Sequence, residues 1–177
     1  MNKLITLEDY KNYLIRFYTN KCDEDKTDER TAYINKHYSD EYLSKIVDNT
    51  EKFLLEIIKD MISIVQYQDD KVWYKKEVST HVYKDIANGC SGGWHADTVF
   101  CADERDFDYL VSTQLIKSFF GSDFIFDLYD DLTERYDEED EIGSIDCTTY
   151  LYIVGPKKLF LELMNNKIPK EFCLVKK

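Results

Sequence analysis

A stripe of apolar side chains that repeats every three to four residues between positions 42 and 65 constrains the fold more than any other feature. The period matches one face of an α-helix, and Ser39 or Asp40 is suited to cap the N-terminus of such a helix. We therefore expect a core helix over residues 40–66, with the polar stretch 48–50 as its weakest point. The stripe consists of Tyr42, Leu43, Ile46, Val47, Phe53, Leu54, Ile57, Ile58, Met61, Ile62 and Val65.

Local sequence signals, most of them at helix ends, predict four further helices. Thr6 and Asp9 have the spacing of a capping box at the start of a helix over residues 7–19. A weaker apolar pattern predicts a helix over 27–37. Asp103 is suited to cap a helix that Gly121 ends. Pro156 is placed for the first turn of the last helix.

After residue 70 the apolar period changes from that of a helix to the alternation of β-strands. Residues 72–74 and 78–82 are β-branched or aromatic and predict two strands, the second continuing towards Ile86. Similar patterns predict strands at 94–101, 124–128 and 147–154, and an edge strand at 172–175. The expected fold class is α+β, with a helical N-terminal third followed by an antiparallel or mixed sheet of about four or five strands with two helices. We expect a helical region over 1–66 and an α+β region over 71–177, joined in one compact unit.

The composition of the chain bears on where in the cell we expect the protein to be. The chain has 177 residues, 33% of them charged, and no apolar run approaches the roughly 18 residues that a membrane helix needs. The apolar segment among the first residues is too short for a signal peptide. Five scattered cysteines without a Cys-x-x-Cys pair do not suggest a disulfide framework. We expect a cytoplasmic protein with no membrane association.

The negative charge is concentrated in one segment. Residues 97–146 contain sixteen acidic and three basic residues, whereas the rest of the chain contains nineteen acidic and twenty basic residues. Such a surface repels nucleic acid and attracts a basic protein or a cation. Within it, residues 127–141 hold nine carboxylates. Their spacing is compatible with an amphipathic helix that has an acidic side, and equally with an acidic loop.

A glycine-rich stretch is the main candidate for a catalytic loop. Gly89, Ser91 and Gly93 match G-x-S-x-G, but no histidine follows His95, as the hydrolase order of serine, acid and histidine would require. A nucleophilic Cys90 with His95 and Asp97 remains an alternative. The simplest interpretation is a glycine turn or bulge that joins two strands.

Metal and cofactor motifs are incomplete. In an EF-hand count that begins at Asp137, Ile142 stands where glycine is needed and Thr148 where glutamate is needed. The spacings of Cys90, His95 and Cys101 do not match zinc modules. We therefore expect no bound cofactor or metal, with clustered carboxylates that hold a divalent metal kept as an enzymatic alternative.

The overall profile is similar to two groups of small nuclease inhibitors, the phage anti-CRISPR proteins and the bacterial toxin-immunity proteins. The similarity lies in the size, the acidity, the excess of nineteen lysines over four arginines that is typical of AT-rich genomes, and the incomplete catalytic motifs. It implies an acidic inhibitor that docks on the basic nucleic-acid-binding surface of a nuclease or nuclease–RNA complex and does not bind DNA itself. The alternatives are a small metal-dependent nuclease or hydrolase and a scaffold protein. The candidate partner-binding residues are Asp127, Tyr129, Asp130, Asp131, Glu134, Tyr136, Asp137, Glu138, Glu139, Asp140 and Glu141.

Overall fold

The computed structural model describes residues 3–18, 27–86, 89–95, 106–137 and 142–168. Within them the chain has an α+β fold, as the sequence predicts. Three helices come first: α1 (Leu7–Tyr18), α2 (Thr27–His37) and α3 (Asp40–Val65). They are followed by β1 (Lys71–Ile86), β2 (Gly89–His95), α4 (Asp106–Phe120), β3 (Ile125–Asp137), β4 (Ile142–Pro156) and α5 (Lys157–Lys167).

Local capping explains where several helices begin and end. Thr6 and Asp9 form the expected capping box before α1, with the Thr6 amide donating to Asp9 and the Asp9 amide to the Thr6 hydroxyl. The Ser39 hydroxyl accepts a hydrogen bond from the Tyr42 amide at the start of α3. Helix α4 ends before Gly121, whose φ of +85° is a conformation that glycine adopts without strain. Pro156 is the N-cap residue of α5, immediately before its first turn.

Helix α3 is continuous over 26 residues, so the break considered at 48–50 does not occur. The polar Thr50 is accommodated inside the core because its hydroxyl bonds to the Ile46 carbonyl one turn earlier and to the Ser112 hydroxyl of α4, 3.0 Å away. The buried apolar side chains of α3 belong to one cluster that also includes residues of α1, α4, α5 and the sheet. This cluster connects the helices to the strands.

The four described strands form one antiparallel sheet in the order β2-β1-β4-β3. The two strands expected within 72–86 are a single strand, β1, with an irregularity between Glu77 and Ser79 where Val78 is the extra residue. In the sequence, the charged residues Lys75, Lys76 and Glu77 separate the two apolar segments, and this interruption explains the prediction of two strands. Near the C-terminal end of β4, a Cβ atom added at Gly155 would fall less than 3.0 Å from three ring carbons of Phe124, so the close approach there favours glycine.

Two segments differ from the expected secondary structure. The glycines of β2 lie within a strand that pairs with β1 from Gly89 to His95, and they do not form a turn. Residues 127–137 are neither helix nor loop, because they belong to β3 and pair with β4. The expected strand at 172–175, residues 96–101 and Asp103 lie outside the described residues.

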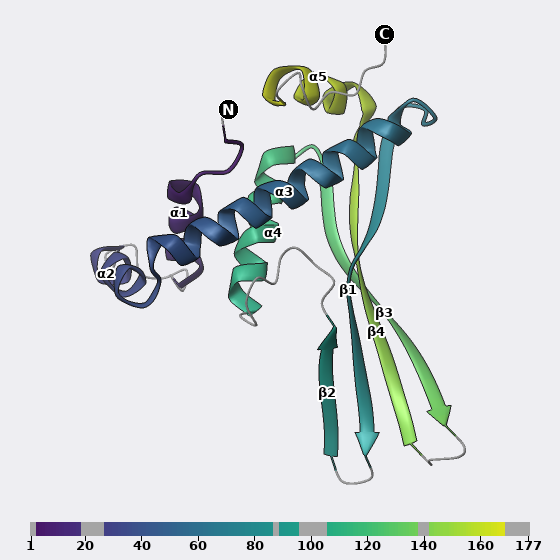
Figure 1. Cartoon of the computed structure of the whole chain (residues 1–177). Helices are drawn as coiled ribbons and strands as arrows, with labels where there is room; N and C mark the ends of the chain where they lie inside the picture. The colour runs from purple at the N-terminus through teal and green to yellow at the C-terminus, as the bar shows by residue number, and fades with distance from the viewer. Residues whose placement is uncertain (1–2, 19–26, 87–88, 96–105, 138–141, 169–177) are drawn as a thin grey trace.

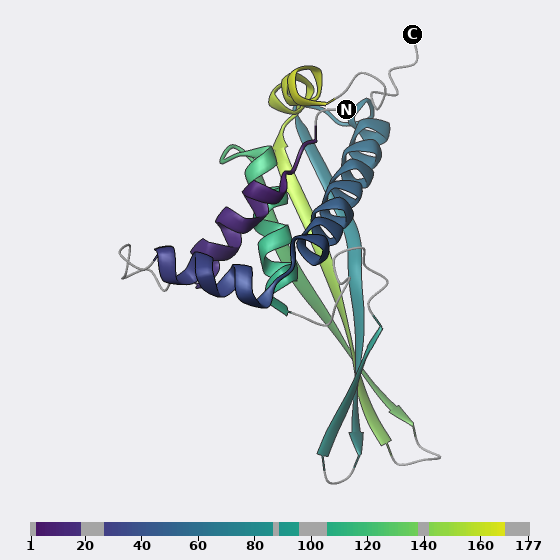
Figure 2. The ribbon, with the colours of Figure 1, turned by 60° about the vertical axis from the view of Figure 1, so that its left-hand side comes forward.

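The helices gather around one end of the sheet, and the strands continue beyond them (Figures 1 and 2). Strand β2 pairs only with the far half of β1, from Thr80 onward. Next to the helices, the sheet therefore consists of β1, β4 and β3. Alternate residues of β1 and β4 are buried towards the helices, including Val72, Tyr74, Leu151 and Ile153, and so is Phe124, which immediately precedes β3. No described helix covers the opposite face of the sheet, which we call the outward face.

Candidate functional site: the outward face of the sheet

The outward face of the sheet carries large apolar side chains that are exposed to solvent. Trp73 on β1 is 52% exposed, and Tyr129 and Ile125 on β3 are 53% and 67% exposed. They alternate with buried or half-buried neighbours, as expected for a sheet that is covered on one face. Exposed aromatic groups at this density are typical of surfaces that bind a partner.

Three of these aromatic rings form a row across the strands. The ring of Tyr152 on β4 lies 5.8 Å from Trp73 and 6.4 Å from Tyr129, measured between ring centroids. The arrangement follows from the register, which pairs Tyr152 with Lys75 on one side and with Asp127 on the other. The Tyr152 ring therefore lies within contact distance of both other rings, although the three come from separate strands.

Lys75 lies beside this row and is already engaged. Its Nζ is 3.7 Å from the ring centroid of Tyr150 and 5.5 Å from that of Tyr152, which are cation–π distances. The hydrogen bond to Tyr152, with the nearby charge of Asp131, raises the pKa of Lys75 above its ordinary value. Lys75 is thus held against two tyrosine rings of β4, while Asp127 and Asp131, the charged residues on β3 whose exposure is described, are carboxylates.

The acidic side of the face is formed by β3. Asp127 and Asp131 are exposed and flank Tyr129 at alternate positions of the strand. Alternate residues of a strand lie on one face about 7 Å apart. The Asp127 carboxylate also accepts a hydrogen bond from the amide of Leu128 at 3.0 Å. These three of the predicted partner-binding residues are therefore brought together in the structure.

The other predicted partner-binding residues are placed only by their backbone or not at all. Asp130, Glu134, Tyr136 and Asp137 continue along β3. Glu138, Glu139, Asp140 and Glu141 lie outside the described residues. The acidic stretch is thus an extended strand for most of its length, which spaces its residues about 3.3 Å apart along a line.

Trp73, Lys75, Tyr150 and Tyr152 belong to this face but were not among the predicted site residues. The sequence does contain a signal for them, because residues 71–77 and 148–154 alternate in the way that a half-exposed strand requires. The alternation shows that these residues share faces within each strand. It does not show which strands are neighbours, so only the register unites them with Tyr129.

The catalytic alternative receives no support from the backbone geometry. Cys90 and His95 are five residues apart on the continuous strand β2, which separates their α-carbons by about 16 Å. A nucleophile and its general base need to be within hydrogen-bond distance of each other. Asp97 lies outside the described residues. Among the residues that the structure describes, no group of three or more His, Cys, Asp and Glu side chains could hold a metal ion.

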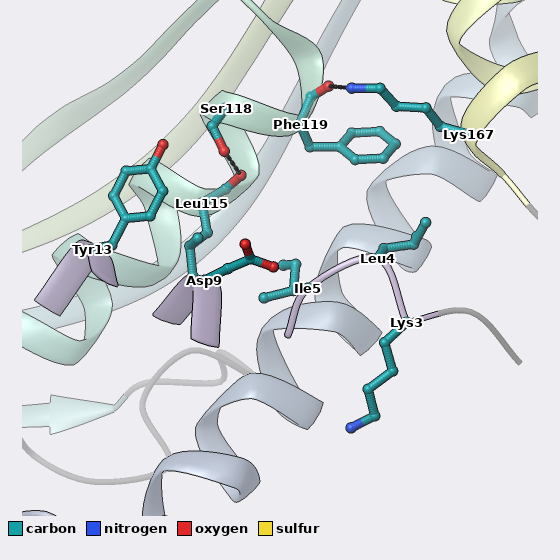
Figure 3. A pocket seen from close by; sticks show the side chains of 9 residues that line it. All are labelled: Lys3, Leu4, Ile5, Asp9, Tyr13, Leu115, Ser118, Phe119 and Lys167. Atoms are coloured by element: carbon teal, nitrogen blue, oxygen red, sulfur yellow. Dashed lines mark hydrogen bonds between the residues drawn. The ribbon is translucent and has the colours of Figure 1, made fainter. Parts of the chain in front are cut away.

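A groove of about 360 Å³ lies between the N-terminal segment, α1, α4 and α5 (Figure 3). Its polar groups serve the packing of the helices around it. Asp9 completes the cap of α1, the Ser118 hydroxyl donates to the Leu115 carbonyl, and Lys167 donates to the Phe119 carbonyl. The groove is therefore a seam between helices, and its polar groups do not converge on a ligand position.

Comparison of the chain with protein families, curated proteins and solved structures gives no match. In the described part of the chain, no helix has the length and apolar character needed to span a membrane.

Proposed function

We propose that this protein is a binding protein that inhibits a nuclease by docking its acidic sheet face on the basic surface where the nuclease binds nucleic acid. The observation that carries the proposal is the row Asp127, Tyr129 and Asp131 on the exposed side of β3. Carboxylates spaced along a strand present negative charge to a lysine- or arginine-lined groove in a way that resembles a phosphate backbone. Exposed aromatic rings next to them supply the apolar contact that charged surfaces lack.

The charge distribution supports the same proposal. Residues 97–146 carry a net charge of −13, whereas the remainder of the chain carries +1. A partner with a basic groove is attracted to one part of the molecule and is oriented by it during association. The helices cover the other face of the sheet, so the outward face is accessible to a large partner.

The test is a cleavage assay with a purified RNA-guided DNA nuclease bound to its guide RNA, alongside a set of purified bacterial toxin nucleases. Stoichiometric inhibition of one of them, weakened by added salt, is expected because exposed charge pairs are screened by salt. The variant Asp127→Asn/Asp131→Asn should bind that nuclease about five- to thirty-fold more weakly, since two exposed ion pairs contribute about 0.5–1 kcal/mol each.

A matched control is available in the loop between α3 and β1. Asp69→Asn/Asp70→Asn changes the net charge by the same amount at two exposed positions. Because the aspartates lie at the β1 side of the sheet, separated from β3 by β4, this variant should inhibit like the wild type. Equal losses in both variants would mean that only net charge matters, and inhibition unaffected by either variant would contradict the proposed surface.

A further inference from the structure

Strand β3 is at one end of the strand order, and no described strand pairs with its outer edge. In an antiparallel pair, the backbone groups of a strand point alternately to its two sides. Half of the N–H and C=O groups of β3 therefore point away from β4. The Leu128 amide, which donates to the side chain of its neighbour Asp127, shows how one such group is satisfied within the chain. An edge of this kind is a template for an added strand.

Side chains at this edge favour an added strand of a particular charge. The exposed face presents Asp127, Tyr129 and Asp131 at alternate positions, and the helix-covered face presents half-buried Phe126 and Leu128. Residues that lie opposite each other on neighbouring strands interact directly, and opposite charges there are stabilising. An incoming strand with arginine or lysine at alternate positions would place these residues against the carboxylates.

The same residues disfavour a second copy of this chain as the added strand. If two β3 strands paired antiparallel about Tyr129, Asp127 of one copy would face Asp131 of the other. If they paired parallel and in register, each aspartate would face its own equivalent. Like charges directly opposite each other destabilise a sheet, so both of these self-pairings are disfavoured, whereas a basic strand would meet opposite charges.

We propose that β3 accepts an extended basic segment of the partner as an additional strand. Arginine or lysine residues at alternate positions of that segment pair with Asp127 and Asp131, and one such residue lies against the ring of Tyr129. The proposal rests on the proposed function and specifies its mode of recognition. Backbone hydrogen bonds to β3 hold the segment, and the two carboxylates with the aromatic ring select its basic side chains.

A set of synthetic octapeptides tests this mode of binding. The first alternates arginine and valine, and the second has glutamine in place of every arginine. Two further peptides have the sequence of the first but carry N-methyl groups on backbone amides. In one the valine amides are methylated, and in the other the arginine amides. Only one of these two sets of amides can face β3 in a sheet, so one N-methylated peptide should lose at least about ten-fold in affinity while the other binds like the first. Binding is measured by calorimetry, with hydrogen exchange of the Leu128 amide as a local readout.

The variants of this chain complete the experiment. Asp127→Asn/Asp131→Asn should weaken the arginine peptide about five- to thirty-fold, and Asp69→Asn/Asp70→Asn should leave it unchanged. Equal affinity for the two N-methylated peptides would overturn strand addition but leave acidic docking intact. Equal affinity for the arginine and glutamine peptides would overturn the charge-based recognition on which the proposed function depends. A dimer that is held by β3 in the absence of peptide would also overturn the proposal.

Discussion

Tyr74 links the sheet to the core helix through one hydrogen bond. Its hydroxyl donates to a carboxylate oxygen of Asp60 on α3 at 2.8 Å, and the side chain is buried. Lys76 lies 3.5 Å from the same oxygen and 3.4 Å from Glu56. Burial first, and then the hydrogen bond to Asp60, raise the pKa of Tyr74 above its ordinary value of 10.0.

The Tyr74→Phe variant should lower the free energy of unfolding by about 1 kcal/mol near neutral pH, because it removes this hydrogen bond. The unfolded chain loses the phenolic proton above about pH 10, whereas the folded chain retains it. The wild type therefore loses stability as the pH rises through this range, and the deficit of the variant should shrink. Urea unfolding from about pH 8 to about pH 11 measures the effect.

Tyr67→Phe is the control for this titration, since Tyr67 is 82% exposed. Its stability should follow that of the wild type at every pH. A Tyr74→Phe deficit that stays constant above about pH 10 would show that the proton is not held more tightly in the folded state.

Helices α3 and α4 are joined by a polar contact inside an apolar core. Thr50 and Ser112 are both buried, and their hydroxyl oxygens are 3.0 Å apart. Thr50→Val keeps the shape of the side chain but leaves the Ser112 hydroxyl without this partner. We expect a loss of about 1–3 kcal/mol in the free energy of unfolding, which is the cost of an unsatisfied buried polar group.

The double variant Thr50→Val/Ser112→Ala should recover part of this loss, because both polar groups are then absent. Chemical denaturation of the two single variants and the double variant gives the coupling energy. Additive losses would mean that the two hydroxyls do not act as a pair.

The elements that could be predicted from the sequence are those with local signals. The capping groups Thr6 and Ser39 lie within four residues of what they cap, so the starts of α1 and α3 were predicted to within one residue. The continuity of β1 and the strand character of residues 127–137 depend on pairing with β4, which is distant in sequence. A dense run of carboxylates has no strong local preference that would reveal such a pairing.

The same distinction applies to the candidate site. Asp127, Tyr129 and Asp131 could be found from sequence because charge and aromatic content mark their segment. Trp73 and Tyr152 could not, because they join Tyr129 only through the order of three strands. The sequence therefore predicts the acidic edge of the candidate site, and the structure adds the aromatic row beside it.

The whole molecule has two ends with different packing. At one end the helices cover one face of β1, β4 and β3, and at the other end the four strands continue past the helices (Figure 1). The described apolar cluster includes Val72, Tyr74 and Val78 from the first half of β1, and Leu151 and Ile153 from the second half of β4. The apolar burial described for these strands thus lies at the end that the helices cover.

This asymmetry predicts a gradient of stability along single strands. The backbone amides of Val72 and Tyr74 on β1 should exchange only through global unfolding, since opening them requires the helices to separate from the sheet. Amides at 82–85 of the same strand should exchange at least about ten-fold faster, which corresponds to an opening free energy lower by about 1.4 kcal/mol. The paired segments 151–154 and 144–147 of β4 should show the same contrast. Native-state hydrogen exchange by NMR with increasing denaturant measures both, and equal protection along β1 would show that interstrand hydrogen bonds, rather than helix packing, set the stability of the sheet.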